Sequence, residues 1–443
     1  MIITGKKLWA LAGGVVLCII ASLLITFAGV RPQSEEKEYS YYYTNYEDPS
    51  ALFALEITNS SGDMTLASVD GEYLAIGDYE LTADKKNAEF FFRLASQVPL
   101  EKKLEDASAA DPQYGLTESS AEVLIIDQNQ NPKCFEIGTP TPDGSGYYSC
   151  LYGDDTVYVL GSDFAECFLD DVTKFYDLSF YPELSGEVFK SLESVEISNK
   201  DRSLVFRNVT PKENEAAVYF RMQSPYELLL SSDQSKNVIL SGLNQIKGTG
   251  VANISPAEFD RLFAESSRDL YILTFENGIK YNLRVIYCAN DAFSYIYSDN
   301  GSYVFEVPTS LLGFTHYSPA DFVGNNLLDF NMSVIESITI GRNEYRISRE
   351  SDKYTVTKNG QTTGAEDFRS SVLSTVNHIS VQEQYTNERV GAELISISFL
   401  TNISQNPAEL TFYESDNGKC VAAINGKPAF ICGTTAVVQL LQL

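Results

Sequence analysis

The sequence predicts an α+β protein, with an N-terminal transmembrane helix followed by a β-rich ectodomain of repeated, mostly antiparallel sheet-plus-helix units. Three observations predict this fold class. Residues 8–30 carry no charge. Beyond residue 50, short segments of alternating apolar and polar residues outnumber segments with helical spacing. The pattern that begins at Leu55 returns at Val195 and again, after an equal interval, at Ile335.

The uncharged run 8–30 is long enough to cross a membrane as a helix. At 1.5 Å per residue it spans about 34 Å, against a hydrocarbon core of about 30 Å. Lys6 and Lys7 precede it and Glu35 and Glu36 follow it. The positive-inside rule therefore predicts a cytoplasmic tail at residues 1–7 and a single-pass protein of the cell membrane whose bulk is extracytoplasmic.

A cleaved signal peptide is the alternative for this segment. Its apolar region usually spans about 7–15 residues, which is shorter than this run, and Phe27 and Val30 spoil a small-residue cleavage pattern. After the run, residues 31–50 are polar and acidic, with five closely spaced tyrosines. We expect this stretch to be a juxtamembrane linker.

The rest of the chain divides into three α+β units, at residues 51–185, 186–330 and 331–443. Each is expected to hold short strands around tight turns, then a helix, further strands and a short closing helix. The main helices are predicted at 83–98, 234–246 and 365–379, from apolar residues at helical spacing. The closing helices are predicted at 163–172, 309–322 and 434–441.

The second unit is the most diverged by sequence, since it carries an extra predicted helix at 256–267. The first and third units compare best. In the third unit, Thr363 and Glu366 have the spacing of a capping box at the start of the helix.

The chain is strongly acidic, with 32 basic and 60 acidic residues and a net charge of −28. Without Lys6 and Lys7 the balance is 30 against 60, a net of −30. Nucleic acid is therefore excluded as a partner, because its affinity depends on Lys and Arg neutralising phosphates. The acidic surface either attracts a cationic ligand or serves only solubility.

Six of the seven cysteines lie outside the predicted membrane helix. Two pairs have the spacing of hairpin partners, Cys134 with Cys150 and Cys420 with Cys432, and they are candidate disulfides in an oxidising compartment. Ordinary buried thiols are the alternative.

No catalytic, cofactor-binding or metal-binding motif stands out, and we expect neither an enzyme nor a cofactor. The two histidines, His316 and His378, are far apart in sequence, and no HExxH or phosphate-binding glycine motif occurs. With 60 acids, some carboxylate pair will have the spacing of a glycoside hydrolase by chance. His378 is expected to stabilise the end of a helix.

One segment resembles a known family. Asp111-Pro112-Gln113-Tyr114-Gly115-Leu116, followed by Ile137-Gly138, Gly146-Tyr147-Tyr148 and Val157-Tyr158, is similar to the bacterial family of unknown function DUF4340. The resemblance implies a membrane-anchored extracytoplasmic protein, often encoded beside ABC-transporter permeases and a Gld-type auxiliary subunit. It implies no catalytic residues. Gly115 is expected at positive φ, with Leu116 entering the core.

Three functions follow as hypotheses. The first is a non-catalytic, membrane-anchored accessory subunit of an ABC-type transport or export complex, whose partner is an ABC permease or a Gld-type auxiliary subunit. The second is an acidic envelope module that binds cationic peptides or cell-wall components. The third is an anchored hydrolase that uses carboxylates.

Overall fold

The computed structural model describes residue 39 and residues 41–211, 218–265, 269–288, 292–350, 353–387, 389–403, 408–415 and 418–443. It divides into two compact units, one ending at Asp177 and the other beginning at Leu178. Within these residues no helix is long and apolar enough to cross a membrane. The predicted tail, the predicted span at 8–30 and residues 31–38 of the predicted linker lie outside them.

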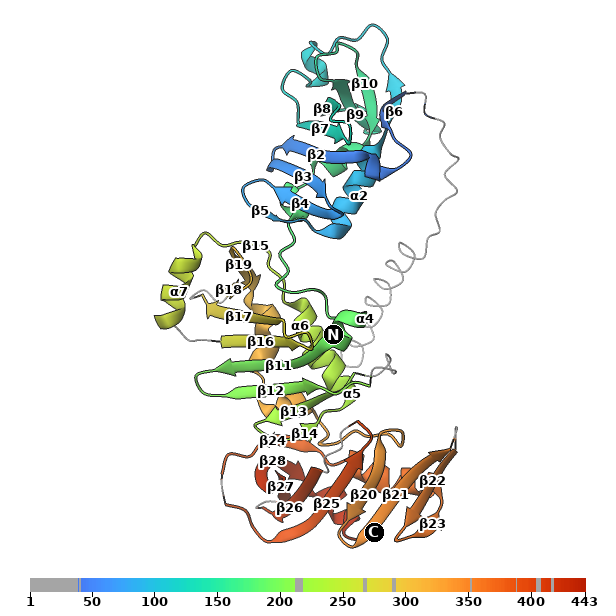
Figure 1. Ribbon diagram of the computed structural model, residues 1–443, viewed down its shortest axis with the longest axis vertical. Coiled ribbons are helices and arrows are strands. Elements are labelled where there is room, and N and C mark those ends of the chain that lie inside the picture. Colours follow the sequence, from blue (N-terminus) through green and yellow to red (C-terminus); the bar gives the residue numbers. More distant parts are fainter. Residues whose placement is uncertain are drawn as a thin grey trace, which may run out of the picture. The chain divides into compact units, whose positions relative to one another are not determined.

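The first unit holds a ten-stranded sheet (Figure 1). In spatial order its strands are β1 (Tyr41–Asn45), β6 (Gln97–Lys103), β10 (Tyr158–Gly161), β9 (Gly146–Leu151), β8 (Pro132–Pro140), β7 (Ala121–Asp127), β2 (Leu52–Asn59), β3 (Gly62–Val69), β4 (Glu72–Ile76) and β5 (Glu80–Thr82). Its helical segments are η1 (Pro49–Ala51), α2 (Lys85–Ser96), η2 (Pro112–Tyr114), α3 (Ser162–Leu169) and η3 (Val172–Phe175).

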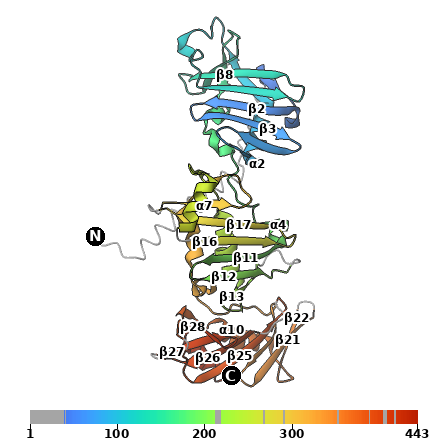
Figure 2. The ribbon, with the colours of Figure 1, turned by 60° about the vertical axis from the view of Figure 1, so that its left-hand side comes forward.

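The second unit holds two sheets of nine strands each, and the first of these is formed by residues 192–308 (Figure 2). Its order is β14 (Leu228–Leu229), β13 (Phe220–Ser224), β12 (Ser203–Asn208), β11 (Leu192–Asn199), β16 (Asp269–Phe275), β17 (Lys280–Tyr287), β18 (Phe293–Ser298), β19 (Val304–Pro308) and β15 (Gly250–Val251). The helical segments are α4 (Gly186–Ser191), α5 (Ser232–Gln234), η4 (Ser235–Leu240), α6 (Ser241–Gln245), α7 (Pro256–Glu265), η5 (Thr309–His316) and α8 (Pro319–Val323).

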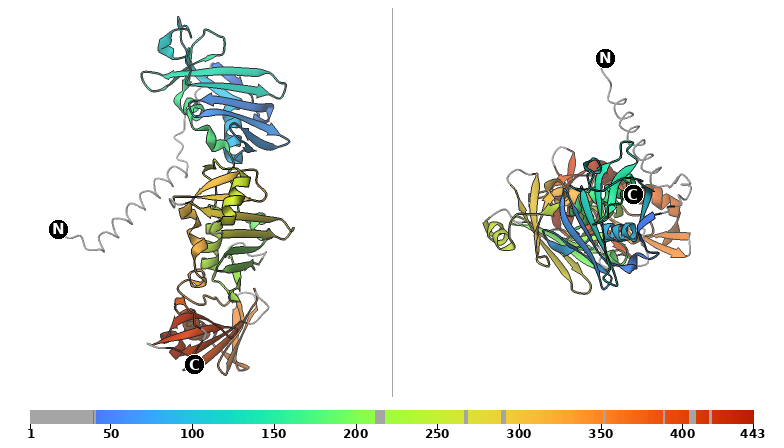
Figure 3. Two further views of the ribbon diagram at one scale, coloured as in Figure 1. Left: turned by 90° about the vertical axis from the view of Figure 1, so that its left-hand side faces the viewer. Right: turned by 90° about the horizontal axis from the view of Figure 1, so that it is seen from above.

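The last sheet is formed by residues 335–433. Its order is β23 (Gln361–Thr363), β22 (Lys353–Lys358), β21 (Asn343–Glu350), β20 (Ile335–Ile340), β25 (Glu393–Thr401), β26 (Ala408–Glu414), β27 (Lys419–Ile424), β28 (Lys427–Gly433) and β24 (Val381–Gln384). Its helices are α9 (Ala365–Asp367), η6 (Phe368–Leu373), α10 (Ser374–Asn377) and α11 (Thr434–Leu440). The described chain ends beside this sheet (Figure 3). There Lys358 Nζ donates to the Leu443 carbonyl at 3.1 Å.

The three sheets have one strand order, and we call them copies 1, 2 and 3. In each copy a four-stranded meander leads to a helix and then to a strand on the far side of the sheet, which we call the edge strand, although in copy 1 the additional strand β1 pairs with its outer side. A second meander begins beside the first strand of the first meander and ends beside that edge strand. The central pairs are β2 with β7, β11 with β16 and β20 with β25. The pairings of the named strands are antiparallel, so the β-rich, antiparallel α+β class is confirmed for the described residues.

The predicted helices occur in all three copies. The main helices are α2 in copy 1, the run α5–η4–α6 in copy 2 and the run α9–η6–α10 in copy 3. The extra helix of copy 2 is α7, and the closing helices are α3, η5 with α8, and α11. The two-unit division falls after Asp177, eight residues before the predicted boundary at 185 (185 − 177).

The predicted capping box in copy 3 is wrong. Thr363 is the last residue of β23 and pairs with Val356, so Gly364 caps the helix without a side-chain hydrogen bond. Tight turns join the short strands, as expected. Asp70-Gly71, Asn359-Gly360 and Asn425-Gly426 all have positive φ at both residues, as two-residue hairpins of type I′ require.

The two sheets of the second unit are joined by a specific contact. Lys427 Nζ, from the hairpin of copy 3, donates to the Pro225 carbonyl of copy 2 at 3.1 Å and lies 5.2 Å from the centre of the Tyr226 ring. Tyr226 in turn packs on Phe430, with ring centres 5.4 Å apart. An apolar contact, a cation–π contact and a hydrogen bond therefore tie the copies together.

The linker prediction is wrong for residues 41–50. Residues 41–45 form β1, which pairs with β6, and Tyr43 is 2% exposed. The Tyr43 ring stacks on Phe135 at 4.8 Å, and its hydroxyl donates to Ser149 Oγ at 3.0 Å. Aromatic contacts continue through Phe168 and Phe91, which belong to α3 and α2. The strand after the predicted anchor is thus part of the core.

We predict that Tyr43→Ala lowers the free energy of unfolding of the first unit by about 3–5 kcal/mol, because it empties a filled aromatic site. Tyr43→Phe loses only the hydrogen bond to Ser149, about 1 kcal/mol. Tyr42, which is 40% exposed, is the matched control, and Tyr42→Ala should change stability by less than about 1 kcal/mol. Pulse proteolysis of the full chain across a urea series measures all three. Equal losses at both positions would contradict the docking of β1.

Candidate functional site

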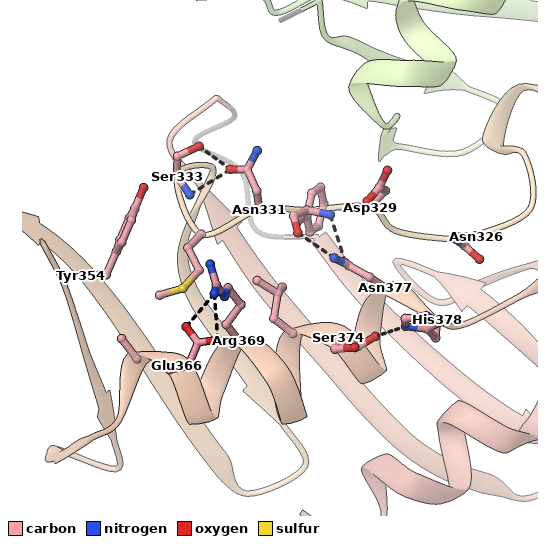
Figure 4. A pocket seen from close by; sticks show the side chains of 14 residues that line it. Asn326, Asp329, Asn331, Ser333, Tyr354, Glu366, Arg369, Ser374, Asn377 and His378 are labelled. Atoms are coloured by element: carbon pink, nitrogen blue, oxygen red, sulfur yellow. Dashed lines mark hydrogen bonds and ion pairs between the residues drawn. The ribbon is translucent and has the colours of Figure 1, made fainter. Parts of the chain in front are cut away.

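A groove enclosing about 650 Å³ lies in copy 3 (Figure 4). One wall is the helical run α9–η6–α10. The other is the segment 326–333, which leads into β20. Tyr354, on β22, lies at one end of the groove, and Asn326 lies at the other.

The base of the groove is apolar. Phe330, Met332 and Leu373 line it and are 4%, 9% and 3% exposed. Phe330 also packs on Phe399 of β25, with ring centres 5.1 Å apart. The base is therefore continuous with the core of copy 3 and has a fixed shape.

The rim is polar. On the helix side, Arg369 donates to both carboxylate oxygens of Glu366, at 2.7 and 2.8 Å, and both side chains are exposed. On the loop side, Asn331 accepts a hydrogen bond from the Ser333 amide at 2.9 Å. Asp329 is exposed on the same segment. Donors, acceptors and charges of both signs thus surround an apolar base, as is common in ligand sites.

An asparagine at the end of the helix holds the loop wall in place. Asn377 Nδ2 donates to the Phe330 carbonyl at 2.7 Å, and its Oδ1 accepts from the Phe330 amide at 3.0 Å. Copy 2 repeats this arrangement, with Asn244 bound to the carbonyl and amide of Leu184 at 3.2 and 2.9 Å. We call this pair of hydrogen bonds the asparagine clamp. In each clamp the side-chain amide both donates and accepts a hydrogen bond, so its role is structural.

The same helices share a second feature. In copies 2 and 3 the helix has a π-helical stretch, Ser235–Leu240 and Phe368–Leu373, and each ends four residues before the clamp asparagine (244 − 240 and 377 − 373). In copy 1, α2 is a regular α-helix. By these two features copies 2 and 3 resemble each other more than either resembles copy 1, although the sequence pattern indicated the reverse. Such π-helical stretches often mark functional positions.

A second hollow, of about 500 Å³, lies in copy 1 between β6 and the turn at 141–145. Asp143 accepts hydrogen bonds from Thr141 Oγ1 at 2.7 Å and from the Ser145 amide at 3.1 Å. These bonds lower the pKa of Asp143 to about 2. The carboxylate therefore holds the turn and stays ionised at neutral pH.

Beside this hollow, the segment 104–116 covers one face of the sheet. Leu116 packs with Cys150 and Val157, and Tyr114 meets Tyr148 edge to face at 4.8 Å. Gly115 has φ 65°, as expected, and a side chain at Gly138 would come within 2.1 Å of the Tyr114 carbonyl oxygen. Two glycines are thus required for the loop to lie on the sheet.

These are the residues that the sequence shares with a known family, and residues 76–262 match the family model described as Domain of unknown function (DUF4340). This segment, which is less than half of the chain, is similar to DUF4340. The DUF4340 match covers most of copy 1 and the first half of copy 2. Its sequence signature is explained by packing, because Gly115, Gly138 and Leu116 fix the covering loop.

Other comparisons add little. No curated protein matches the chain. One solved structure, DNA polymerase III subunit beta from Borrelia burgdorferi in complex with a natural product, is 9% identical, with 90% of this chain and 83% of that chain covered. Its TM-score of 0.16 is too low to support an argument about fold or function.

The four cysteines that the sequence singled out are thiols in this structure. Cys420 lies directly opposite Cys432 on β27 and β28, and its Sγ is 3.5 Å from the Cys432 carbonyl oxygen. Cys150 instead lies opposite Glu136, so it is diagonal to Cys134. The predicted register is confirmed for the second pair and wrong for the first. Whether the second pair is oxidised stays a prediction.

The two histidines are not brought together. His316 ends η5 in copy 2 and packs on Tyr287 at 5.0 Å, whereas His378 follows α10 in copy 3 and lies 2.6 Å from the Ser374 carbonyl through Nδ1. Among the described residues, no group of three or more His, Cys, Asp or Glu side chains is placed to hold a metal ion.

Sequence reasoning missed the groove, because its two walls come from separate segments of the chain, 326–333 and 365–378. A signal was present in the sequence. Asn244 and Asn377 both lie near the C-terminal ends of the predicted helices at 234–246 and 365–379. Aligning the two helices would have identified the clamp asparagines, though not the groove beside Asn377.

We predict that Asn377→Ala opens the loop wall, since it leaves the amide and carbonyl of Phe330 without their partner, at a cost of about 1–3 kcal/mol. The Phe330 amide should exchange faster with deuterium. Asn244→Ala should speed exchange at Leu184 and leave Phe330 unchanged. Ser370→Ala, on the exposed face of the same helix, is the control. Unchanged exchange at Phe330 in Asn377→Ala would rule out the clamp.

We also predict that refolding in a glutathione redox buffer joins Cys420 to Cys432 and leaves Cys134 and Cys150 reduced. Directly opposite residues have Cβ atoms about 4.5–5.5 Å apart, whereas the Cα atoms of diagonal residues are about 7–8 Å apart. A disulfide needs Cα atoms within about 6.8 Å, so only the opposite pair can form one without backbone movement. Burial raises the pKa of the Cys420 thiol to about 11, so oxidation should be fast only before the hairpin is buried. Peptide mapping by mass spectrometry, with Cys420→Ser as control, identifies the pair. A Cys134–Cys150 bond would contradict the strand register.

Proposed function

We propose that the protein is a non-catalytic, membrane-anchored extracytoplasmic accessory subunit of an ABC-type transport or export complex. The observation that carries the proposal is the repetition of one α+β fold three times after an apolar run of membrane-spanning length. Repeating a unit multiplies the surfaces that can contact partners. A chain anchored by one helix, with its bulk extracytoplasmic, also needs a membrane partner for any energy-dependent step.

The junction between copies 2 and 3 supports this role. The contacts of Lys427 with Pro225 and Tyr226 tie the two sheets to each other. A subunit that presents a surface to a transporter benefits from such a tie, because a rigid surface loses less conformational entropy on binding. The proposed partner is an ABC permease or a Gld-type auxiliary subunit.

A second candidate is an acidic envelope module that binds cationic peptides or cell-wall components. The net charge of −28 favours it, since an acidic surface attracts cations over distances set by the ionic strength. The two functions are compatible. An anchored hydrolase finds less support, because Glu366 in the groove is engaged by Arg369.

The test is purification of the tagged full-length protein from its native membrane in mild detergent, followed by mass spectrometry of the proteins that accompany it. We expect enrichment of an ABC permease and its ATPase over a tagged, unrelated single-pass protein. A version that begins at residue 39 behind a cleavable signal peptide should lose this enrichment. Recovery of the full-length protein alone, under conditions that keep a known membrane complex intact, would contradict the proposal.

A further inference from the structure

We propose that the groove of copy 3 binds a basic peptide segment, with one lysine side chain lying along the apolar base and its ammonium group at a carboxylate of the rim. The inference deepens the proposed binding role of the ectodomain by naming a site and a ligand class. It depends on the proposed binding role of the ectodomain only for where the peptide comes from. The groove itself provides the chemistry.

The shape and lining of the groove fit such a side chain. Lysine has an apolar stem of four methylene groups and a charged head, and it buries the stem where the head can stay hydrated. Phe330, Met332 and Leu373 provide the apolar base, and the exposed rim provides the polar surroundings. A volume of about 650 Å³ lies within the range of about 300–1,000 Å³ of ligand sites and holds more than one side chain.

The charges of the rim select a cation. Asp329 and Glu366 contribute two negative charges and Arg369 contributes one positive charge, so the ionised rim has a net charge of −1 (−2 + 1). Glu366 already accepts two hydrogen bonds from a guanidinium group, at 2.7 and 2.8 Å. A ligand ammonium would share or replace Arg369 at this carboxylate. An anionic ligand would meet repulsion from both the rim and the chain as a whole.

The groove is also formed before the ligand arrives. The asparagine clamp fixes Phe330, and Phe330 is packed on Phe399. The base therefore does not have to be ordered on binding, which reduces the entropic cost. Tyr354 lies at one end of the groove, where a neighbouring residue of the peptide can contact its ring (Figure 4).

The experiment is fluorescence anisotropy of fluorescein-labelled pentalysine titrated with the full-length chain in detergent, at about 150 mM salt, where the screening length is about 8 Å. Labelled pentaglutamate and a neutral Ser-Gly pentapeptide are the reference probes. The variants are the double substitution Asp329→Asn with Glu366→Gln, the single substitution Arg369→Gln and the control Asp233→Asn. Asp233 is the second residue of α5, as Glu366 is of α9, so the control removes one charge at the equivalent position of copy 2.

We expect pentalysine to bind and the reference probes not to bind. The double variant should bind pentalysine about tenfold more weakly, as expected for the loss of two partly exposed charge contacts. Arg369→Gln should bind about threefold more tightly, because it removes the competing cation, and a gain of affinity cannot come from misfolding. Asp233→Asn should stay within about twofold of the parent.

Two results would overturn the proposal. If pentalysine does not bind, the groove is not a lysine site, and the co-purification test of the accessory role is unaffected. If Asp233→Asn weakens binding as much as the double variant does, pentalysine recognises the overall charge and not the groove.

Discussion

Each copy depends on one antiparallel pairing between strands that are far apart in sequence. β2 pairs with β7, β11 with β16 and β20 with β25, and in each case the rest of the first meander, the main helix and the edge strand lie between the two partners along the chain. Both meanders grow outward from this pair. The entropy of closing so long a loop must be offset by burial, which explains why these strands are lined with apolar residues on one face.

The connection between the edge strand and the second meander gives each copy its individual character. In copy 1 it is the segment 104–120, which carries the DUF4340 signature and covers one face of the sheet. In copy 2 it contains α7, whose Phe259 covers Ile286 and Val304. In copy 3 it is only the segment 385–392. The fold thus tolerates change at one connection while the central pairing is kept.

Much of this architecture could be predicted from the sequence. The strand that begins each copy follows from alternating apolar and polar residues, and the three main helices follow from apolar residues at helical spacing. The Asx-Gly turns follow from the tolerance of these residues for positive φ. All three signals are local. The failures have non-local causes. Tyr43 looked like part of a linker, because only the distant Phe135 and Ser149 show that it is buried. Cys134 and Cys150 have hairpin spacing, yet the register of β8 against β9 places them diagonally.

The groove is the clearest case of information that local patterns do not contain. Its apolar base and polar rim come from a loop and a helix that are joined by the asparagine clamp, and each looks ordinary alone. Comparison of copies is more informative. Copies 2 and 3 share the clamp and the π-helical stretch. In copy 3 the exposed pair Glu366 and Arg369, on the same helical run, also lines the groove.

The most direct test of the central claim, that the protein is three copies of one fold built on a central strand pair, is native-state hydrogen exchange of the full-length chain. We predict that the slowest amides in every copy lie in the central pairs β2–β7, β11–β16 and β20–β25. The fastest strands in each should be at the sheet edges, β5, β14 and β23. Slowest exchange at an edge strand, or a central pair unprotected in any one copy, would contradict the claim.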